Sequence, residues 1–137
     1  MYIPYGRQSI DDEDIRAVTE VLCSEFLTQG PAVPAFEHAV SSYCGVNFAF
    51  AMNSATSALH VACLALGVSP GDLVWTTAIS FVASANCARY CGADVDFVDI
   101  DPNSYNICPK HLEQKLRQAE ERGKLPKVVI PVHLCGQ

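Results

Sequence analysis

The stretch Asn53-Ser54-Ala55-Thr56-Ser57-Ala58-Leu59 decides the fold of this chain. It follows a short apolar run at 47–52, which we expect to be a β-strand, and it opens an apolar segment to Leu66, which we expect to be a helix. The first N–H groups of a helix have no partner within it, and the helix dipole adds partial positive charge there. A junction of this kind is therefore a candidate phosphate site, although Ser54 is also an ordinary N-cap residue.

The bulk composition indicates a globular protein. Half of the 137 residues are hydrophobic, so a disordered chain is excluded. The net charge is −6 and the basic residues are scattered, which argues against nucleic acid as a partner. No apolar run reaches the length needed to cross a membrane, and residues 1–5 do not begin a secretory signal. We expect a cytoplasmic protein.

The chain has seven cysteines, an odd number, and no C-x-x-C motif. This usage is typical of reduced thiols that act as small hydrophobic side chains. Cys87 and Cys91 are one helical turn apart, but no histidine accompanies them at ligand spacing, so we expect no metal site.

From residue 47 onward, strand patterns and helix patterns alternate. The order is β-α-β-α-β-α-β, which predicts an α/β fold with parallel strands. We expect an N-terminal arm with two helices at 1–46 and an incomplete α/β domain at 47–137, because the chain stops directly after a strand-like run. Ser9 and Asp12 form the expected capping pair of the first helix. The expected helices are 11–23, 31–43, 54–66, 80–90 and 109–122, and the expected strands are 47–52, 73–77, 94–100 and 127–132.

Ligands of parallel sheets bind beyond the carboxyl ends of the strands. Four segments are predicted to meet at this edge: the turn at 53–57, the loop at 76–81, Asp99–Asp101 and His133. A Rossmann-type nucleotide module is disfavoured, because the first turn lacks the G-x-G-x-x-G pattern.

Several ordered motifs together resemble a known family. They are the 53–59 turn, Thr77–Asn86, Val95–Asp101, Pro131–Gly136, and the N-terminal pieces Ile3–Gly6 and Phe26–Pro31. Across the whole chain they resemble the sugar-nucleotide aminotransferases of the DegT/StrS type, which are fold-type-I enzymes using pyridoxal 5′-phosphate (PLP). The resemblance is greatest to the pseudaminic-acid-pathway members, which aminate C4 of a UDP-linked 4-keto-6-deoxy sugar. It implies part of the large domain of that fold, a glutamate donor and a homodimer.

The resemblance also implies roles for particular residues. Ala55 and Thr56 would hold the cofactor phosphate, and Ser57 would add an N–H group. Phe81 would stack on the cofactor ring, although core packing is the ordinary alternative for an aromatic residue. The nucleotide sugar would contact Tyr5, Glu25, Phe26, Leu27 and Thr28. For the loop at 25–28, an ordinary surface turn is the alternative interpretation. Asn86 and His133 would lie near the site without an assigned role.

One departure from the family concerns the lysine that carries the cofactor. In the family this lysine lies beyond the position at which this sequence ends, and the lysines at 110, 115, 124 and 127 do not match its motif. We therefore assign no catalytic residue within the chain and expect it to be inactive by itself. A non-catalytic pseudo-enzyme or regulatory protein of the same fold is the alternative.

Overall fold

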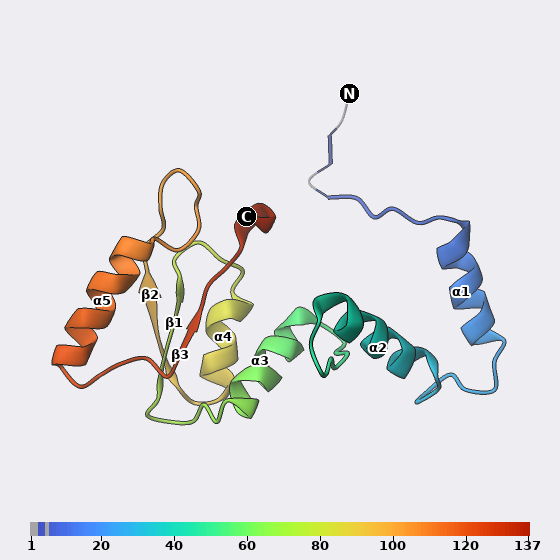
Figure 1. Cartoon of the computed structure of the whole chain (residues 1–137), viewed down its shortest axis with the longest axis horizontal. Coiled ribbons are helices and arrows are strands. Elements are labelled where there is room, and N and C mark those ends of the chain that lie inside the picture. The colour runs from blue at the N-terminus through green and yellow to red at the C-terminus, as the bar shows by residue number, and fades with distance from the viewer. Residues whose placement is uncertain (1–2, 5) are drawn as a thin grey trace. The chain divides into compact units, whose positions relative to one another are not determined.

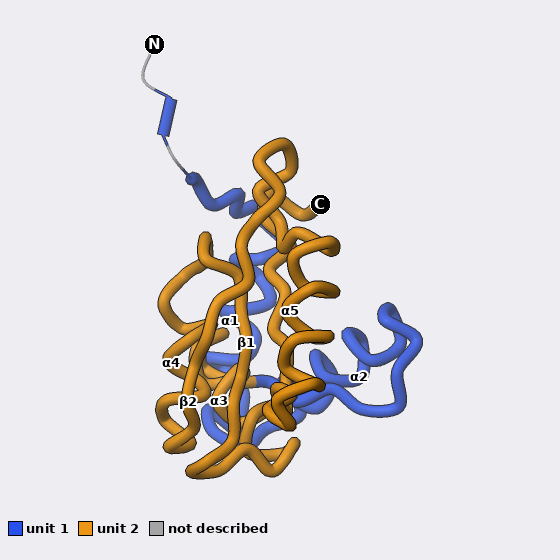
Figure 2. Tube along the Cα trace, turned by 90° about the vertical axis from the view of Figure 1, so that its left-hand side faces the viewer, with its two compact units in different colours: residues 1–51 blue, residues 52–137 orange. Residues whose placement is uncertain are grey.

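The computed structural model describes every residue except 1, 2 and 5, so Tyr5 lies outside the described residues. The chain divides into two compact units, residues 1–51 and 52–137 (Figure 2). Each unit is described by itself below. The domain boundary expected at 46/47 stays a prediction.

The first unit contains two helices, α1 (Asp12–Leu22) and α2 (Ala32–Cys44). Asp11 caps α1: its side chain accepts the N–H groups of Glu13 and Asp14, and the Asp14 carboxylate accepts the Asp11 N–H. The predicted pair of Ser9 with Asp12 is wrong, because Asp11 and Asp14 form a reciprocal capping box at the correct three-residue spacing.

The ends of α2 confirm the sequence signals. Pro31 directly precedes the first helical residue, where its missing N–H costs nothing. Gly45 ends the helix with φ of +66°, a left-handed conformation that glycine adopts without strain.

The second unit is a three-stranded parallel sheet with helices on both faces (Figure 1). The strand order is β2 (Asp94–Val98), β1 (Leu73–Thr77), β3 (Val128–Ile130), and Val74 pairs with Val95 on one side and Val128 on the other. The helices are α3 (Ala55–Ala65), α4 (Ala83–Tyr90) and α5 (Pro109–Glu121), followed by a short 3₁₀ turn, η1 (Leu134–Gly136). The predicted α/β class with parallel strands is confirmed.

The strand expected at 47–52 is wrong. Within the described part of the chain this segment has no ladder partner, and the Ala51 N–H donates to the Glu37 carboxylate at 2.8 Å instead. Phe48 and Phe50 are exposed. A strand needs a neighbouring strand for its backbone groups, so an apolar run alone did not produce one here. The alternating order therefore begins with α3 and continues as β1-α4-β2-α5-β3.

Alternate residues of β1 build two hydrophobic clusters on opposite faces of the sheet. Val74 packs with Cys63, Cys87 and other small residues of α3 and α4. Trp75 packs on the other face with Val98 and the α5 residue Ala119. Figure 1 shows α4 and α5 on opposite sides of the strands.

Helix α4 packs on one side of α3, and among the described residues Cys63 is the one α3 residue that is fully buried. Val61 and Leu64 remain exposed. Within the described residues, none of the helices has the length and apolarity required to cross a membrane.

Candidate cofactor site

The turn before α3 is held by its own side chains. Ser54 is the N-cap, and its Oγ accepts the Ser57 N–H at 3.1 Å. The Ser57 hydroxyl donates to Asn53 Oδ1 at 2.7 Å. The N-cap interpretation of Ser54 is therefore confirmed, and the turn is organised independently of any ligand.

This arrangement leaves specific donors open. The N–H groups of Ala55 and Thr56 and the Thr56 hydroxyl have no acceptor among the described residues. They lie at the positive end of an 11-residue helix, where an anion is stabilised. The Ser57 N–H, in contrast, is already bonded, so Ser57 serves the turn itself rather than presenting a free donor.

The loop after β1 presents Phe81 to its surroundings. Ala78 N–H donates to Val98 O at 3.2 Å, which fixes the start of the loop to the end of β2. Phe81 is 74% exposed, so packing against the residues that the structure describes does not explain this aromatic residue. Helix α4 begins at Ala83 rather than at Ser80 as predicted, because the Ser80 hydroxyl bonds to Phe81 O and Ser84 Oγ in a turn that precedes the helix.

The loops after β2 and β3 are joined at the same edge of the sheet. Asn106 Oδ1 accepts the Leu134 N–H at 2.8 Å. Asp101 shapes its own loop, because the N–H groups of Asn103 and Ser104 donate to its carboxylate and hold its pKa below the usual value. Sequence reasoning missed Asn106, since an Asn in a turn is ordinary and gives no signal of a contact 28 residues away.

Asn86 and His133 share no hydrogen-bond network with the other predicted residues that the structure describes. Asn86 is half-buried in α4 without a described side-chain hydrogen bond, and His133 is exposed with Nδ1 at 3.1 Å from Gln137 O. No hydrogen bond among the described residues joins the 53–57 turn to the Phe81 loop.

The residues expected to contact a nucleotide sugar belong to the first unit. Glu25, Phe26, Leu27 and Thr28 are all exposed, and the Phe26 N–H donates to Ser24 Oγ at 3.3 Å. Their assignment to a nucleotide sugar stays a prediction, as does that of Tyr5.

The open donors and the exposed ring fit a phosphorylated aromatic cofactor. Two backbone N–H groups and one hydroxyl at a helix N-terminus suit a phosphate, and an exposed phenyl face suits a flat ring. Among the residues that the structure describes, there is no cluster of His, Cys, Asp and Glu that would hold a metal ion.

Comparison with known families decides the relationship. The sequence pattern of the DegT/DnrJ/EryC1/StrS aminotransferase family matches residues 8–137. The chain belongs to this family. Aminotransferases of the family depend on PLP.

Two curated relatives show how much of a family member the chain represents. It is 40% identical to the spore coat polysaccharide biosynthesis protein SpsC of Bacillus subtilis, over 99% of this chain and 33% of the relative. It is 48% identical to a UDP-4-amino-4,6-dideoxy-N-acetyl-beta-L-altrosamine transaminase of Campylobacter jejuni, over 83% of this chain and 30% of the relative. The chain thus spans about a third of the length of these relatives.

Solved structures of aminotransferases share the fold. PseC of Helicobacter pylori, an aminotransferase involved in pseudaminic acid biosynthesis, matches with a TM-score of 0.83 and 35% identity, over 93% of this chain and 33% of PseC. The PMP form of the putative sugar aminotransferase Spr1654 of Streptococcus pneumoniae matches with a TM-score of 0.84 and 31% identity, over 98% of this chain and 32% of that protein. The same protein has also been solved in a PLP form.

Proposed function

We propose that this chain is the N-terminal part of a PLP-dependent aminotransferase that aminates C4 of a UDP-linked 4-keto-6-deoxy sugar, with glutamate as the amino donor. The reaction would serve pseudaminic acid or surface-glycan biosynthesis. The names of the Campylobacter and Helicobacter relatives support this substrate class. A cytoplasmic location and a homodimeric assembly are part of the proposal.

The observation that carries the cofactor assignment is the pattern of used and unused donors before α3. Asn53, Ser54 and Ser57 satisfy one another, while the Ala55 and Thr56 N–H groups and the Thr56 hydroxyl are left for a ligand. We assign these open groups to the cofactor phosphate. Phe81, exposed on the loop after β1, supplies the face for the ring.

The chain's own residues would bind and orient the cofactor. When bound, the cofactor supplies an electron sink for proton transfer at the carbon next to the amine. Ala55 and Thr56 would anchor its phosphate, Phe81 would shield one ring face from water, and Tyr5 with residues 25–28 would contact the nucleotide sugar.

None of the chain's lysines is assigned as the cofactor-carrying lysine. Lys115 is bonded to Asp96 and to Phe97 O, and Lys127 is bonded to Asp72 and to Gly67 O. Lys110 and Lys124 are exposed, whereas a lysine of this kind needs a buried position that lowers its pKa. We therefore propose that the reactive amine comes from outside these 137 residues and that the chain alone does not turn over.

The phosphate assignment is tested by titrating the chain with PLP and with pyridoxal, which lacks the phosphate. Thr56→Ala should weaken PLP binding about tenfold, since a hydrogen bond to a charged group contributes about 1.5 kcal/mol or more. Pyridoxal binding should be unaffected. Thr19→Ala is the matched control, because the Thr19 hydroxyl bonds within α1 to Ile15 O. Equal PLP affinity in wild type and Thr56→Ala would contradict the assignment.

A further inference from the structure

The loop between β1 and α4, residues 78–82, exposes much apolar surface for its length. Ile79, Phe81 and Val82 are 44%, 74% and 60% exposed. Apolar side chains scattered singly over a surface need no explanation, whereas a group of them in one short loop indicates an interaction site. The loop directly follows the carboxyl end of β1, where ligands of parallel sheets bind.

Thr77, the last residue of β1, fixes the first half of this loop. Its hydroxyl donates to Ile79 O at 3.1 Å, and the Ala78 N–H donates to Val98 O at 3.2 Å. Thr77 is 1% exposed, so its side chain cannot touch a ligand itself. A buried hydroxyl that bonds to the main chain two residues further on determines the direction in which the chain leaves the strand.

Serine side chains fix the second half of the loop. The Ser80 hydroxyl lies 3.2 Å from Phe81 O and 2.6 Å from the hydroxyl of Ser84, which is buried at the start of α4. The Ser84 N–H also donates to Phe81 O at 3.0 Å. The carbonyl groups of Ile79 and Phe81 are thus both bonded. Phe81 therefore has a defined backbone conformation, which restricts the rotamers available to its ring.

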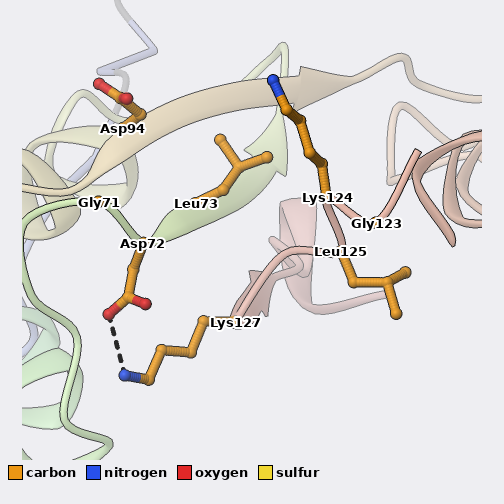
Figure 3. A pocket seen from close by; sticks show the side chains of 8 residues that line it. All are labelled: Gly71, Asp72, Leu73, Asp94, Gly123, Lys124, Leu125 and Lys127. Carbon is orange, nitrogen blue, oxygen red and sulfur yellow. Dashed lines mark hydrogen bonds and ion pairs between the residues drawn. The ribbon is translucent and has the colours of Figure 1, made fainter.

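The opposite end of β1 is built from charged side chains (Figure 3). A pocket of about 430 Å³ lies there, with Leu73, the first residue of the strand, in its wall. Figure 3 shows the Lys127 amine paired with the Asp72 carboxylate, at 2.9 Å. A flat aromatic ring is suited to the apolar loop at the carboxyl end of the strand rather than to this ion pair.

We propose that Thr77 is a positioning residue for the cofactor ring: through its hydrogen bond to Ile79 O it holds the 78–82 loop in the conformation that presents the face of Phe81. This inference rests on the proposed function, because it takes Phe81 as the residue that stacks on the cofactor. A ring that is oriented before binding avoids the entropy cost of ordering a free side chain in the complex.

The test compares the affinities of two ligands for the 137-residue chain by isothermal titration calorimetry. Pyridoxine 5′-phosphate carries the ring and phosphate of the cofactor but no aldehyde, so it forms no imine with a lysine. Glycerol 3-phosphate carries the phosphate without the ring. Thr77→Val, which replaces the hydroxyl by a methyl group, should weaken pyridoxine 5′-phosphate about fivefold, the loss expected for an impaired aromatic contact. Glycerol 3-phosphate should bind unchanged.

Thr76→Val is the matched control. Thr76 is also 1% exposed, and its hydroxyl donates to Ile130 O at 2.9 Å. This variant therefore removes an equivalent buried hydrogen bond that does not reach the loop. It should lower the free energy of unfolding as Thr77→Val does, without changing the affinity for pyridoxine 5′-phosphate. Thr77→Ser keeps the hydroxyl and should keep the wild-type affinity.

A double-variant comparison shows whether Thr77 acts through the ring. In the Phe81→Ala background, Thr77→Val should have no further effect on pyridoxine 5′-phosphate, because the ring that Thr77 positions is absent. Thr77→Ala, in which no methyl group replaces the hydroxyl beside the Ile79 carbonyl, gives a second variant of the same residue should the valine prevent folding.

The outcomes separate this inference from the proposed function. Unchanged affinity in the Thr77 variants would overturn the inference. So would an equal loss for both ligands, or a loss that persists when Phe81 is alanine, since either result would show a merely structural role. A wild-type chain that binds neither ligand, or Phe81→Ala that binds pyridoxine 5′-phosphate as the wild type does, would instead contradict the proposed function on which the inference rests.

Discussion

At the residue scale, the candidate site depends on which hydrogen-bond donors are already used. Ser54 and Ser57 look equivalent to Thr56 in the sequence, since all three carry hydroxyls at a helix start. In the structure the two serines bond to each other and Ser57 also donates to Asn53, whereas the donors of Ala55 and Thr56 stay open among the described residues. Which of these residues bond within the turn and which can bind a ligand therefore follows from the geometry of the turn rather than from residue type.

The cysteines allow a prediction at the same scale. Burial, a hydrogen bond with Cys87 and charge repulsion from Cys87 and Cys91 together raise the pKa of the Cys63 thiol to about 12. The thiolate is the reactive form, so Cys63 should react with a disulfide reagent at pH 8 at least 100-fold more slowly than an exposed thiol.

The measurement is the time course of thiol release in the native protein. We expect fast modification of the exposed Cys23, Cys44 and Cys135 and slow modification of the buried Cys63, Cys87, Cys91 and Cys108. Denaturant should make all seven react alike. Native Cys63 reacting as fast as Cys23 would show that α3 and α4 do not pack as described.

At the element scale, helix ends are controlled by glycines in a left-handed conformation. Gly92 follows α4 with φ of +77°, and Gly123 follows α5 with φ of +63°. A Cβ added at Gly92 would lie 2.8 Å from Pro70 Cγ, whereas one at Gly123 would meet open space. The two positions share the backbone requirement and differ only in steric room.

This pair gives a matched prediction. Gly123→Ala should lower the free energy of unfolding by about 1 kcal/mol, the cost of a left-handed conformation for a residue with a Cβ. Gly92→Ala should cost about 1–3 kcal/mol more, because the Pro70 ring must move. Urea denaturation of both variants measures the difference. Equal losses of unfolding free energy in the two variants would mean that the Ser69–Asp72 turn moves away from the new Cβ at no energetic cost.

At the scale of the whole second unit, Lys127 and Asp72 tie together segments far apart in the sequence. Lys127 Nζ donates to Gly67 O, just after α3, and to Asp72, just before β1. Asp72 also accepts the Ser69 N–H at 2.8 Å. The start of β3 is thereby connected to the α3–β1 turn.

The pH dependence of this connection can be predicted. The hydrogen bond from Lys127 and then that from the Ser69 N–H hold the pKa of Asp72 below its usual value. A group whose pKa is lower in the folded state stabilises the fold above its unfolded-state pKa, and this contribution is lost as the pH falls through the folded-state pKa. Asp72→Asn should therefore lower the melting temperature at pH 7, and the gap from wild type should close in the acid range.

Asp94→Asn is the matched control, since Asp94 forms an exposed pair with Arg89. It should have little effect on the melting temperature, because exposed ion pairs contribute little. If the gap between wild type and Asp72→Asn is the same at pH 3 as at pH 7, the ionised carboxylate is not the stabilising group.

Much of the fold was predictable because its signals are local. Gly45, Pro31 and the amphipathic pattern of α5 marked element ends and faces correctly, since conformational limits and periodicity act within a few residues. The run at 47–52 was misassigned because a strand requires a partner, which no local pattern reveals. Ser9 was chosen over Asp11 because both suit an N-cap, and only the backbone geometry at 11–14 separates them.

The sequence by itself determined the α/β class, the family and the turn at 53–59, because the motifs and the residues that cap a helix start are formed by consecutive residues. Tertiary structure decided which donors of that turn remain open and that Phe81 is exposed rather than buried. Those facts depend on contacts between residues distant in the chain, and such contacts exist only once the helices have packed on the sheet.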